Sequence, residues 1–257
     1  MRKTRQIRRG IYVLPTLFTV GNLLCGYSSL IRSYQGAVEQ AAILIIIAGV
    51  LDGLDGRIAR LTGTTTEFGV EFDSLADIVS FGVAPAMLAY RWALHSFDRL
   101  GWFIAFIFVV CAAMRLARYN IQTNVGDKRH FAGLPSPMAA GALAAAAYAF
   151  PAVQRSEAFD VMLGLLVAAL ALMMVSRVRY RSFKEFDLRD RRSYFYVLPV
   201  AAMMVAIGIY PKWALLILAA AYLASAPATS VWTVVRRATP GAATVDREGI
   251  IDESPLR

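Results

Sequence analysis

The chain has 257 residues, of which 58% are hydrophobic, and its mean hydropathy of +0.52 excludes an ordinary soluble domain. The formal net charge is +9, from 27 Lys and Arg against 18 Asp and Glu. Nucleic-acid binding is poorly supported, because the basic residues lie at the ends of apolar stretches and not on one exposed face. With two cysteines and two histidines, the sequence predicts neither a disulfide framework nor a zinc site.

The apolar stretches predict an all-α integral membrane protein, a polytopic bundle of about eight transmembrane helices. Each stretch approaches the roughly 20 residues that a helix needs to cross a bilayer. The stretches cover residues 11–32, 38–57, 69–92, 101–120, 136–152, 159–176, 194–210 and 213–235. They define a membrane-embedded domain over 11–238, with a basic arm at 1–10 before it. The polar tail at 239–257 lacks periodicity and is predicted to be disordered.

The distribution of basic residues predicts the orientation of this bundle. If the N-terminus is cytoplasmic, 22 of the 27 Lys and Arg fall in cytoplasmic segments, seven of them in the loop at 177–193. The positive-inside rule then places both termini in the cytoplasm. The remaining five basic residues lie on the opposite side: Arg32, Arg91, Arg99, Arg155 and Lys212.

Four carboxylates lie close together in a chain that is otherwise apolar and basic: Asp52, Asp55, Asp73 and Asp77. The first two are three residues apart and the last two are four apart, so each pair shares one helix face. A polar turn from Thr62 to Glu67 separates the pairs, with Gly63 as the predicted helix stop. A hairpin would bring the four acids together, and such a cluster needs cations to stay ionised. Hard divalent ions, Mg²⁺ or Mn²⁺, suit carboxylate ligands.

The alternative for this segment is a polar hairpin whose acids merely face solvent. Ionisable side chains beside a membrane are costly, which disfavours that interpretation. A transporter with a cation site in its core is a second alternative. Such a site would lie near the bilayer midplane, whereas these acids lie at the ends of the predicted helices.

The spacing of the acids resembles a known signature, D-x2-D-G-x2-A-R-x8-G-x3-D-x3-D, which is that of the CDP-alcohol phosphatidyltransferases. The chain carries every fixed position: Asp52, Asp55, Gly56, Ala59, Arg60, Gly69, Asp73 and Asp77. The resemblance covers the first five apolar stretches by motif, and the last three match only in general character. It implies a helical membrane bundle, usually a homodimer, with a polar cavity open to the cytoplasm, so that 11–238 would be the catalytic domain.

The resemblance also implies roles for individual residues. The four aspartates would together hold two divalent cations. Asp77 would also be the base that takes the acceptor's proton. The residues implied in CDP-diacylglycerol binding are Gly56, Ala59, Arg60, Gly69 and Asn22. In the first stretch the family often has P-N-x2-T-x2-N; this chain has Thr16 after Pro15 but keeps Thr19 and Asn22. Asn22 would lie near the nucleotide or support an acid, and plain helix packing is an equal alternative for it.

Two further motifs narrow the resemblance to the serine-using branch of the family. They are RLARYN at 115–120 and F-x-G-L-P-S-P at 131–137. This branch implies that CDP-diacylglycerol and L-serine react to give phosphatidylserine and CMP, at a bacterial inner membrane. The residues that could bind serine are Arg115, Arg118, Asn120 and Ser136. The two arginines could instead be topology residues, and the acceptor could be glycerol phosphate, inositol phosphate or choline.

Overall fold

The structure is a computed structural model that describes residues 3–63, 66–124, 133–152, 156–176 and 194–238. Every regular element within these ranges is helical, which confirms the all-α prediction. The elements are α1 (Lys3–Tyr34), α2 (Val38–Thr62), α3 (Glu67–Asp77), η1 (Ile78–Val83), α4 (Ala84–Trp92), η2 (Leu94–Phe97), α5 (Asp98–Asn124), α6 (Ser136–Ala149), α7 (Glu157–Val175), α8 (Tyr194–Ile209) and α9 (Pro211–Ala238).

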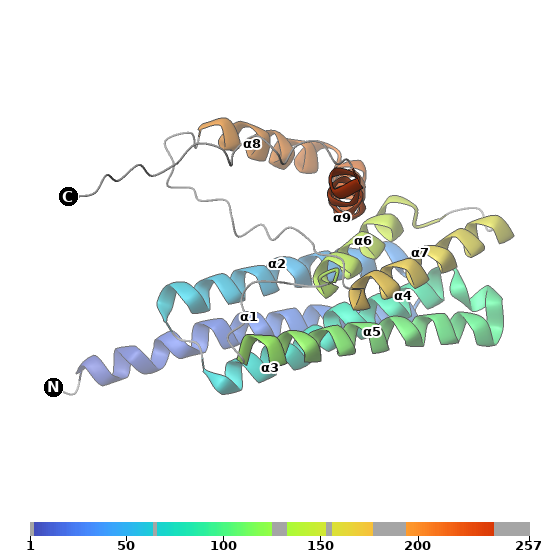
Figure 1. The fold of residues 1–257 in the computed structure, drawn as a ribbon. Coiled ribbons are helices and arrows are strands. Elements are labelled where there is room, and N and C mark those ends of the chain that lie inside the picture. Colours follow the sequence, from blue (N-terminus) through green and yellow to red (C-terminus); the bar gives the residue numbers. More distant parts are fainter. Residues whose placement is uncertain (1–2, 64–65, 125–132, 153–155, 177–193, 239–257) are drawn as a thin grey trace, which may run out of the picture.

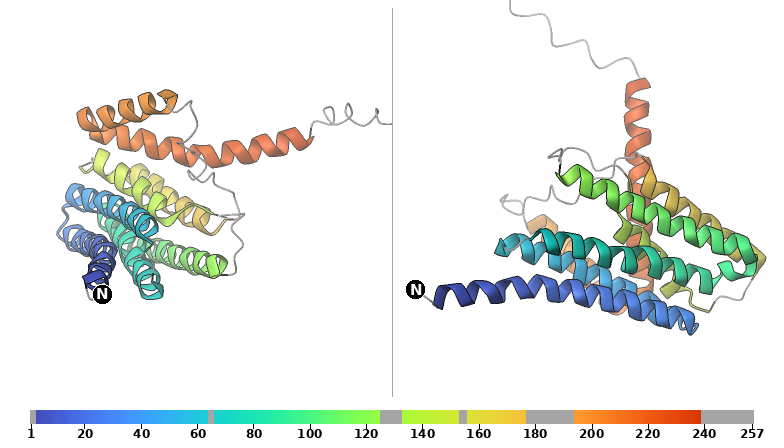
Figure 2. Two further views of the ribbon diagram at one scale, coloured as in Figure 1. Left: turned by 90° about the vertical axis from the view of Figure 1, so that its left-hand side faces the viewer. Right: turned by 90° about the horizontal axis from the view of Figure 1, so that it is seen from below.

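Helices α1 to α5 lie side by side in one bundle, which α6 and α7 complete (Figure 1). Helix α9 packs on α6 and runs across the direction of α1 to α5, and α8 packs on α9 (Figure 2). Three helical segments of the described chain are long and apolar enough to cross a membrane: Glu67–Trp92, Leu94–Ile121 and Glu157–Val175. They coincide with three of the predicted stretches.

Each of the other five predicted stretches overlaps a helix, namely α1, α2, α6, α8 and α9. Their role as membrane spans stays a prediction. Helix α1 begins at Lys3, so the basic arm at 1–10 continues directly into the first helix. The basic loop at 177–193 and the tail at 239–257 lie outside the described residues. The disorder of that tail therefore stays a prediction.

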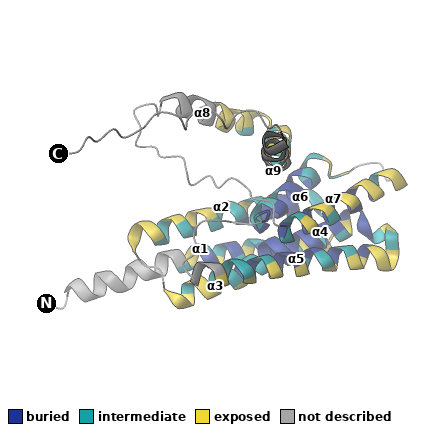
Figure 3. Ribbon diagram, viewed as in Figure 1, coloured by how far each residue is buried: buried dark blue, intermediate teal, exposed yellow. Residues whose placement is uncertain are grey.

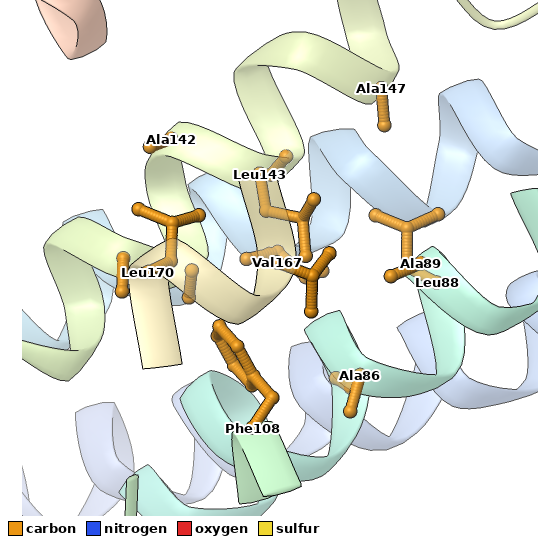
Figure 4. Close-up of a cluster of buried hydrophobic side chains, with 14 of the residues drawn as sticks. Ala86, Leu88, Ala89, Phe108, Ala142, Leu143, Ala147, Val167 and Leu170 are labelled. Atoms are coloured by element: carbon orange, nitrogen blue, oxygen red, sulfur yellow. The ribbon is translucent and has the colours of Figure 1, made fainter. Parts of the chain in front are cut away.

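The buried core lies where α4, α5, α6 and α7 meet (Figures 3 and 4). Phe108 from α5 packs there with Leu143 from α6 and Val167 from α7, all fully buried. Much of the remaining core is alanine, with six of these buried alanines on α6. Small side chains let helix backbones approach closely, which suits association in lipid, where dispersion replaces the hydrophobic effect.

The end of α2 and the start of α3 flank the predicted polar turn. Helix α2 ends at Thr62, and Gly63 adopts the left-handed conformation with φ 63°, its N–H donating to the Ala59 carbonyl. Thr66 then caps α3, because its hydroxyl accepts a hydrogen bond from the Gly69 N–H at 3.0 Å. A glycine stop and a threonine cap are the termini that helix physics favours. The structure therefore confirms the hairpin and its stop residue.

A π-helical segment, η1, follows Asp77 directly and connects α3 to α4. The N–H of Ala84 donates to the Val79 carbonyl, a bond that spans five residues. The next residue, Pro85, has no N–H, and its ring would press on the carbonyl four residues back in an α-helix. The wider π turn is how this chain accommodates the proline.

Helix α1 crosses η1 at very close range. The Ser80 hydroxyl donates to the Asn22 carbonyl at 3.0 Å, and both residues are fully buried. The closeness depends on Gly26, where an added Cβ would lie 2.3 Å from the Ser80 Oγ and 2.8 Å from its Cα. The hydroxyl could rotate away, but the backbone atom could not.

We therefore expect Gly26→Ala to lower the free energy of unfolding by about 1–3 kcal/mol, the usual cost of overpacking a buried contact. Thermal unfolding of the purified protein in detergent measures the change. Gly49→Ala is the matched control, since its Cβ would meet only Phe81 Cε1 at 3.8 Å. That variant should be as stable as the parent or more so, because alanine favours helix. Equal midpoints for the two variants would contradict the close crossing.

Candidate active site

Three of the four predicted acids converge. Carboxylate oxygens of Asp52, Asp73 and Asp77 all lie within 4.8 Å of one another, Asp52 from α2 and the other two from α3. The Asp73 Oδ1 atom is buried and has no hydrogen-bond partner within the described part of the chain. A buried acceptor without a donor needs a cation or a proton. The residues present therefore fit a divalent metal, and the cluster could hold one.

Asp55 lies outside this group of three, although it is close enough to interact electrostatically with Asp73. It is 5% exposed, and its Oδ2 atom accepts a hydrogen bond from the Thr19 hydroxyl of α1. A carboxylate has further lone pairs for a second partner. The structure thus places the fourth predicted ligand at the edge of the cluster, with one oxygen held by α1.

Helix α1 supports the cluster through two polar side chains that lie three residues apart on one face. Thr19 binds Asp55, as described, and the Asn22 amide donates to the Asp77 Oδ1 at 3.2 Å. Asn22 is fully buried. Of the alternatives for Asn22, the geometry matches support of an acid. Helix α1 therefore fixes one carboxylate from each half of the motif.

The glycines of the motif lie on both sides of the turn. A Cβ on Gly56 would meet the guanidinium of Arg60, whose Nη1 would be 3.6 Å away. The Arg60 side chain is exposed, and Ala59 beside it is half-buried. Gly69 belongs to the cap of α3, where its Cβ would lie 3.0 Å from the Thr66 hydroxyl. Contact of these four residues with CDP-diacylglycerol stays a prediction.

The four residues predicted to bind serine separate into two groups. Arg115 donates from Nη1 to the Ser136 hydroxyl at 2.8 Å and interacts electrostatically with Asp77 and Asp52. Arg118 donates from both terminal nitrogens to the Val175 carbonyl at 3.4 Å, at the end of α7. Arg115 therefore lies near the acids with Ser136 bonded to it, whereas Arg118 is attached to a neighbouring helix.

Asn120 also faces a neighbouring helix, since its amide donates to the Ser74 hydroxyl of α3 at 2.9 Å. This bond links α5 to the residue that follows Asp73.

Two residues of the site region were not assigned from the sequence. Thr19 could have been found from the sequence, because it lies three residues before Asn22 and so shares its helix face. Tyr222 of α9, which interacts electrostatically with Arg115, had no such signal.

Comparison with known proteins supports this site. Residues 12–178 match the family model for CDP-alcohol phosphatidyltransferase. The chain belongs to this family. The matched region runs from α1 through α7 and contains all four aspartates, so it extends one predicted stretch beyond the motifs. The family is one of membrane-embedded transferases, in agreement with the apolar helices.

Several curated relatives are similar over most of the chain. The CDP-diacylglycerol–serine O-phosphatidyltransferase of Helicobacter pylori strain J99 is 38% identical over 213 residues, 78% of this chain and 88% of that protein. The protein of the same name from Mycobacterium leprae is 30% identical over 225 residues, 84% of this chain and 74% of that protein. The archaetidylserine synthase of Methanothermobacter thermautotrophicus is 36% identical over 169 residues, 65% of this chain and 69% of that protein.

The contact between Thr19 and Asp55 gives a test of the cluster. We expect Thr19→Val to weaken binding of Mn²⁺ to the purified protein about ten- to a hundredfold, because a buried carboxylate loses a hydrogen bond worth about 1.5–3 kcal/mol. Electron paramagnetic resonance of free Mn²⁺ measures the affinity. Thr19→Ser keeps the hydroxyl and should bind the ion like the parent. If valine and serine variants bind alike, Thr19 does not position the carboxylate.

Proposed function

We propose that this protein transfers the phosphatidyl group of CDP-diacylglycerol to L-serine, giving phosphatidylserine and CMP. Membership of the family supports the donor, and the names of the relatives support serine as the acceptor. The observation that carries the proposal is the convergence of Asp52, Asp73 and Asp77, with the Arg115 guanidinium beside them. Transfer from a pyrophosphate to a zwitterionic alcohol requires cations to neutralise the phosphates and a basic group to bind the carboxylate of the alcohol. The acids could hold the cations, and Arg115 is the basic group.

The reaction exchanges one phosphorus–oxygen bond for another. The serine hydroxyl oxygen attacks the phosphorus that carries diacylglycerol, and the bond from that phosphorus to the bridging anhydride oxygen breaks. CMP leaves with the electron pair of that bond, and the hydroxyl proton passes to a base. Asp77 is the proposed base: Asn22 holds its Oδ1 atom, which leaves Oδ2 to accept the proton. A base in this role contributes about 10²–10⁴-fold to the rate.

The proposed cofactor is a pair of divalent cations, Mg²⁺ or Mn²⁺. The residues that would hold them are Asp52, Asp73 and Asp77, with Asp55 at the edge of the cluster. When bound, such ions neutralise phosphate charge and stabilise the leaving group. Gly56 and Ala59 would give the nucleotide close access to α2, and Arg60 and Gly69 would lie beside the phosphates at the two ends of the turn.

Arg115 is the proposed partner of the serine carboxylate. Its position between the acids and Ser136 leaves a forked guanidinium next to the reaction centre, a geometry suited to a carboxylate. Ser136 and Asn120 would supply neutral polar groups near the ammonium. Arg118 would act by holding α5 against α7, because its guanidinium binds the Val175 carbonyl.

We further propose that the helical bundle lies in a bacterial inner membrane, with both termini and the acids on the cytoplasmic side. The uneven distribution of Lys and Arg supports this orientation, since 22 of 27 would be cytoplasmic. The cytoplasm is also where serine is available. A homodimer is proposed from the family resemblance.

An acceptor panel tests the function. Purified protein with CDP-diacylglycerol and Mn²⁺ or Mg²⁺ should release CMP fastest with L-serine, and more slowly with glycerol phosphate, inositol phosphate or choline. Excess chelator should abolish release. Asp73→Asn should lower it at least a hundredfold, because the orphaned Oδ1 acceptor would no longer belong to a charged ligand. Faster turnover of glycerol phosphate would reject serine as acceptor, and activity in chelator would reject the metal.

The two arginines of α5 give a matched pair of variants. Arg115→Ala should raise the KM for serine about ten- to a hundredfold, the cost of one charge-assisted hydrogen bond, with little change in the KM for CDP-diacylglycerol. Arg118→Ala should leave the ratio of the two KM values unchanged and lower the unfolding midpoint. A selective rise in the KM for CDP-diacylglycerol would assign Arg115 to the lipid phosphate. No change in either KM for Arg115→Ala would make Arg115 a topology residue.

A further inference from the structure

A second polar site lies at the end of the bundle opposite the acids. A cavity of about 240 Å³ is formed there by the turn between α1 and α2, the end of α4 and the start of α7. Along α2, Val38 at the cavity and Asp52 lie about 20 Å apart, at 1.5 Å of rise per residue. The residues that matter for its chemistry are Gly36, Arg91, Trp92, Pro151, Phe159 and Asp160.

Asp160 is the unusual member of this set. It lies in the first turn of α7, lines the cavity and is only 6% exposed. Its Oδ1 atom has no hydrogen-bond partner within the part of the chain that the structure describes. The positive end of the helix offsets part of its charge, but a buried carboxylate still needs a donor or a cation. Asp160 plays no part in the proposed reaction, so this need points to a separate ligand.

Arg91 lines the same cavity from the last turn of α4 and is exposed. Among the described side chains it forms no ion pair, in contrast to Lys212 at the same end, which pairs with Glu39 at 2.9 Å. The cavity therefore offers one carboxylate and one guanidinium that are not bonded to each other. A ligand that carries both a positive and a negative group would satisfy both.

The wall of the cavity is fixed by aromatic contacts. Trp92 and Phe159 pack edge to face with ring centroids 5.5 Å apart. The indole N–H of Trp92 donates to the Phe150 carbonyl at 3.1 Å, which holds the ring in place. Trp92 ends one candidate span, and another begins at Glu157, beside Phe159. Tryptophan at such a position is typical of the level of the lipid headgroups.

We propose that this cavity binds the headgroup of a zwitterionic phospholipid that carries a primary amine, with the ammonium on Asp160 and the phosphate on Arg91. The location at the ends of two candidate spans favours a lipid over a soluble zwitterion. The Asp160 Oδ1 atom, which has no hydrogen-bond partner among the described residues, favours a primary ammonium over a trimethylammonium, because only the former has N–H groups to donate. The site is separate from the acids, so it does not depend on the proposed reaction.

The experiment measures lipid retention by the purified full-length protein with native mass spectrometry. Phosphatidylethanolamine, phosphatidylcholine and phosphatidylglycerol of equal chain length are added in turn. We expect phosphatidylethanolamine to be retained best, and Asp160→Asn and Arg91→Gln each to weaken its retention about tenfold, the effect of losing one charge-assisted contact. Glu157→Gln and Arg99→Gln are the matched controls, exposed and outside the cavity, and should retain it like the parent.

Several outcomes would overturn the proposal. Equal retention of phosphatidylethanolamine by Asp160→Asn and by Glu157→Gln would remove the carboxylate from the site. Equal retention of the three lipids would show that the cavity does not select a primary-amine headgroup. If soluble L-serine displaces phosphatidylethanolamine and O-phosphoethanolamine does not, the ligand is a free amino acid and not a lipid. Arg91→Gln changes an exposed side chain, so it remains informative if Asp160→Asn fails to fold.

Discussion

Mutual repulsion between carboxylates is the constraint on which this molecule depends. Asp52, Asp73 and Asp77 are held within a few ångströms of one another in a chain with a large apolar surface. Neither α2 nor α3 could hold such an arrangement alone. Helix α1 supplies two hydrogen-bond donors to the acids, and its packing against η1 keeps both donors in reach. The basic residue nearby, Arg115, comes from α5. The site is therefore formed by four helices, α1, α2, α3 and α5, which together offset the repulsion between the carboxylates.

The sequence predicted those features whose determinants are local. The hairpin between Thr62 and Glu67 could be predicted because a glycine stop and a threonine cap are short-range signals. The acid cluster could be predicted because helical spacing and charge together leave few other arrangements. The helical class follows from hydropathy alone.

Other features depend on contacts between distant segments, which spacing cannot specify. Arg115 and Arg118 are three residues apart on α5, yet their side chains bind different helices. Arg115 binds Ser136 of α6, and Arg118 binds the Val175 carbonyl at the end of α7. Asp55 was expected among the other acids, and the hydroxyl of Thr19, 36 residues earlier, binds it instead. Tyr222 reaches Arg115 only because α9 packs on α6. Each of these contacts depends on which helices pack together in the tertiary structure, and residue spacing along the sequence does not specify that packing.

The π segment before Pro85 changes how the helix periodicity of this region must be counted. A π turn holds about one residue more than the α-helical turn it replaces. Residues on either side of 78–83 are therefore offset by roughly 100° from the positions that a continuous α-helix would give them. A helical wheel drawn straight through 69–92 would put the acids and Trp92 on wrong relative faces. For the same reason, a relative that lacked one residue within this segment could keep every motif position and still direct its acids away from α1.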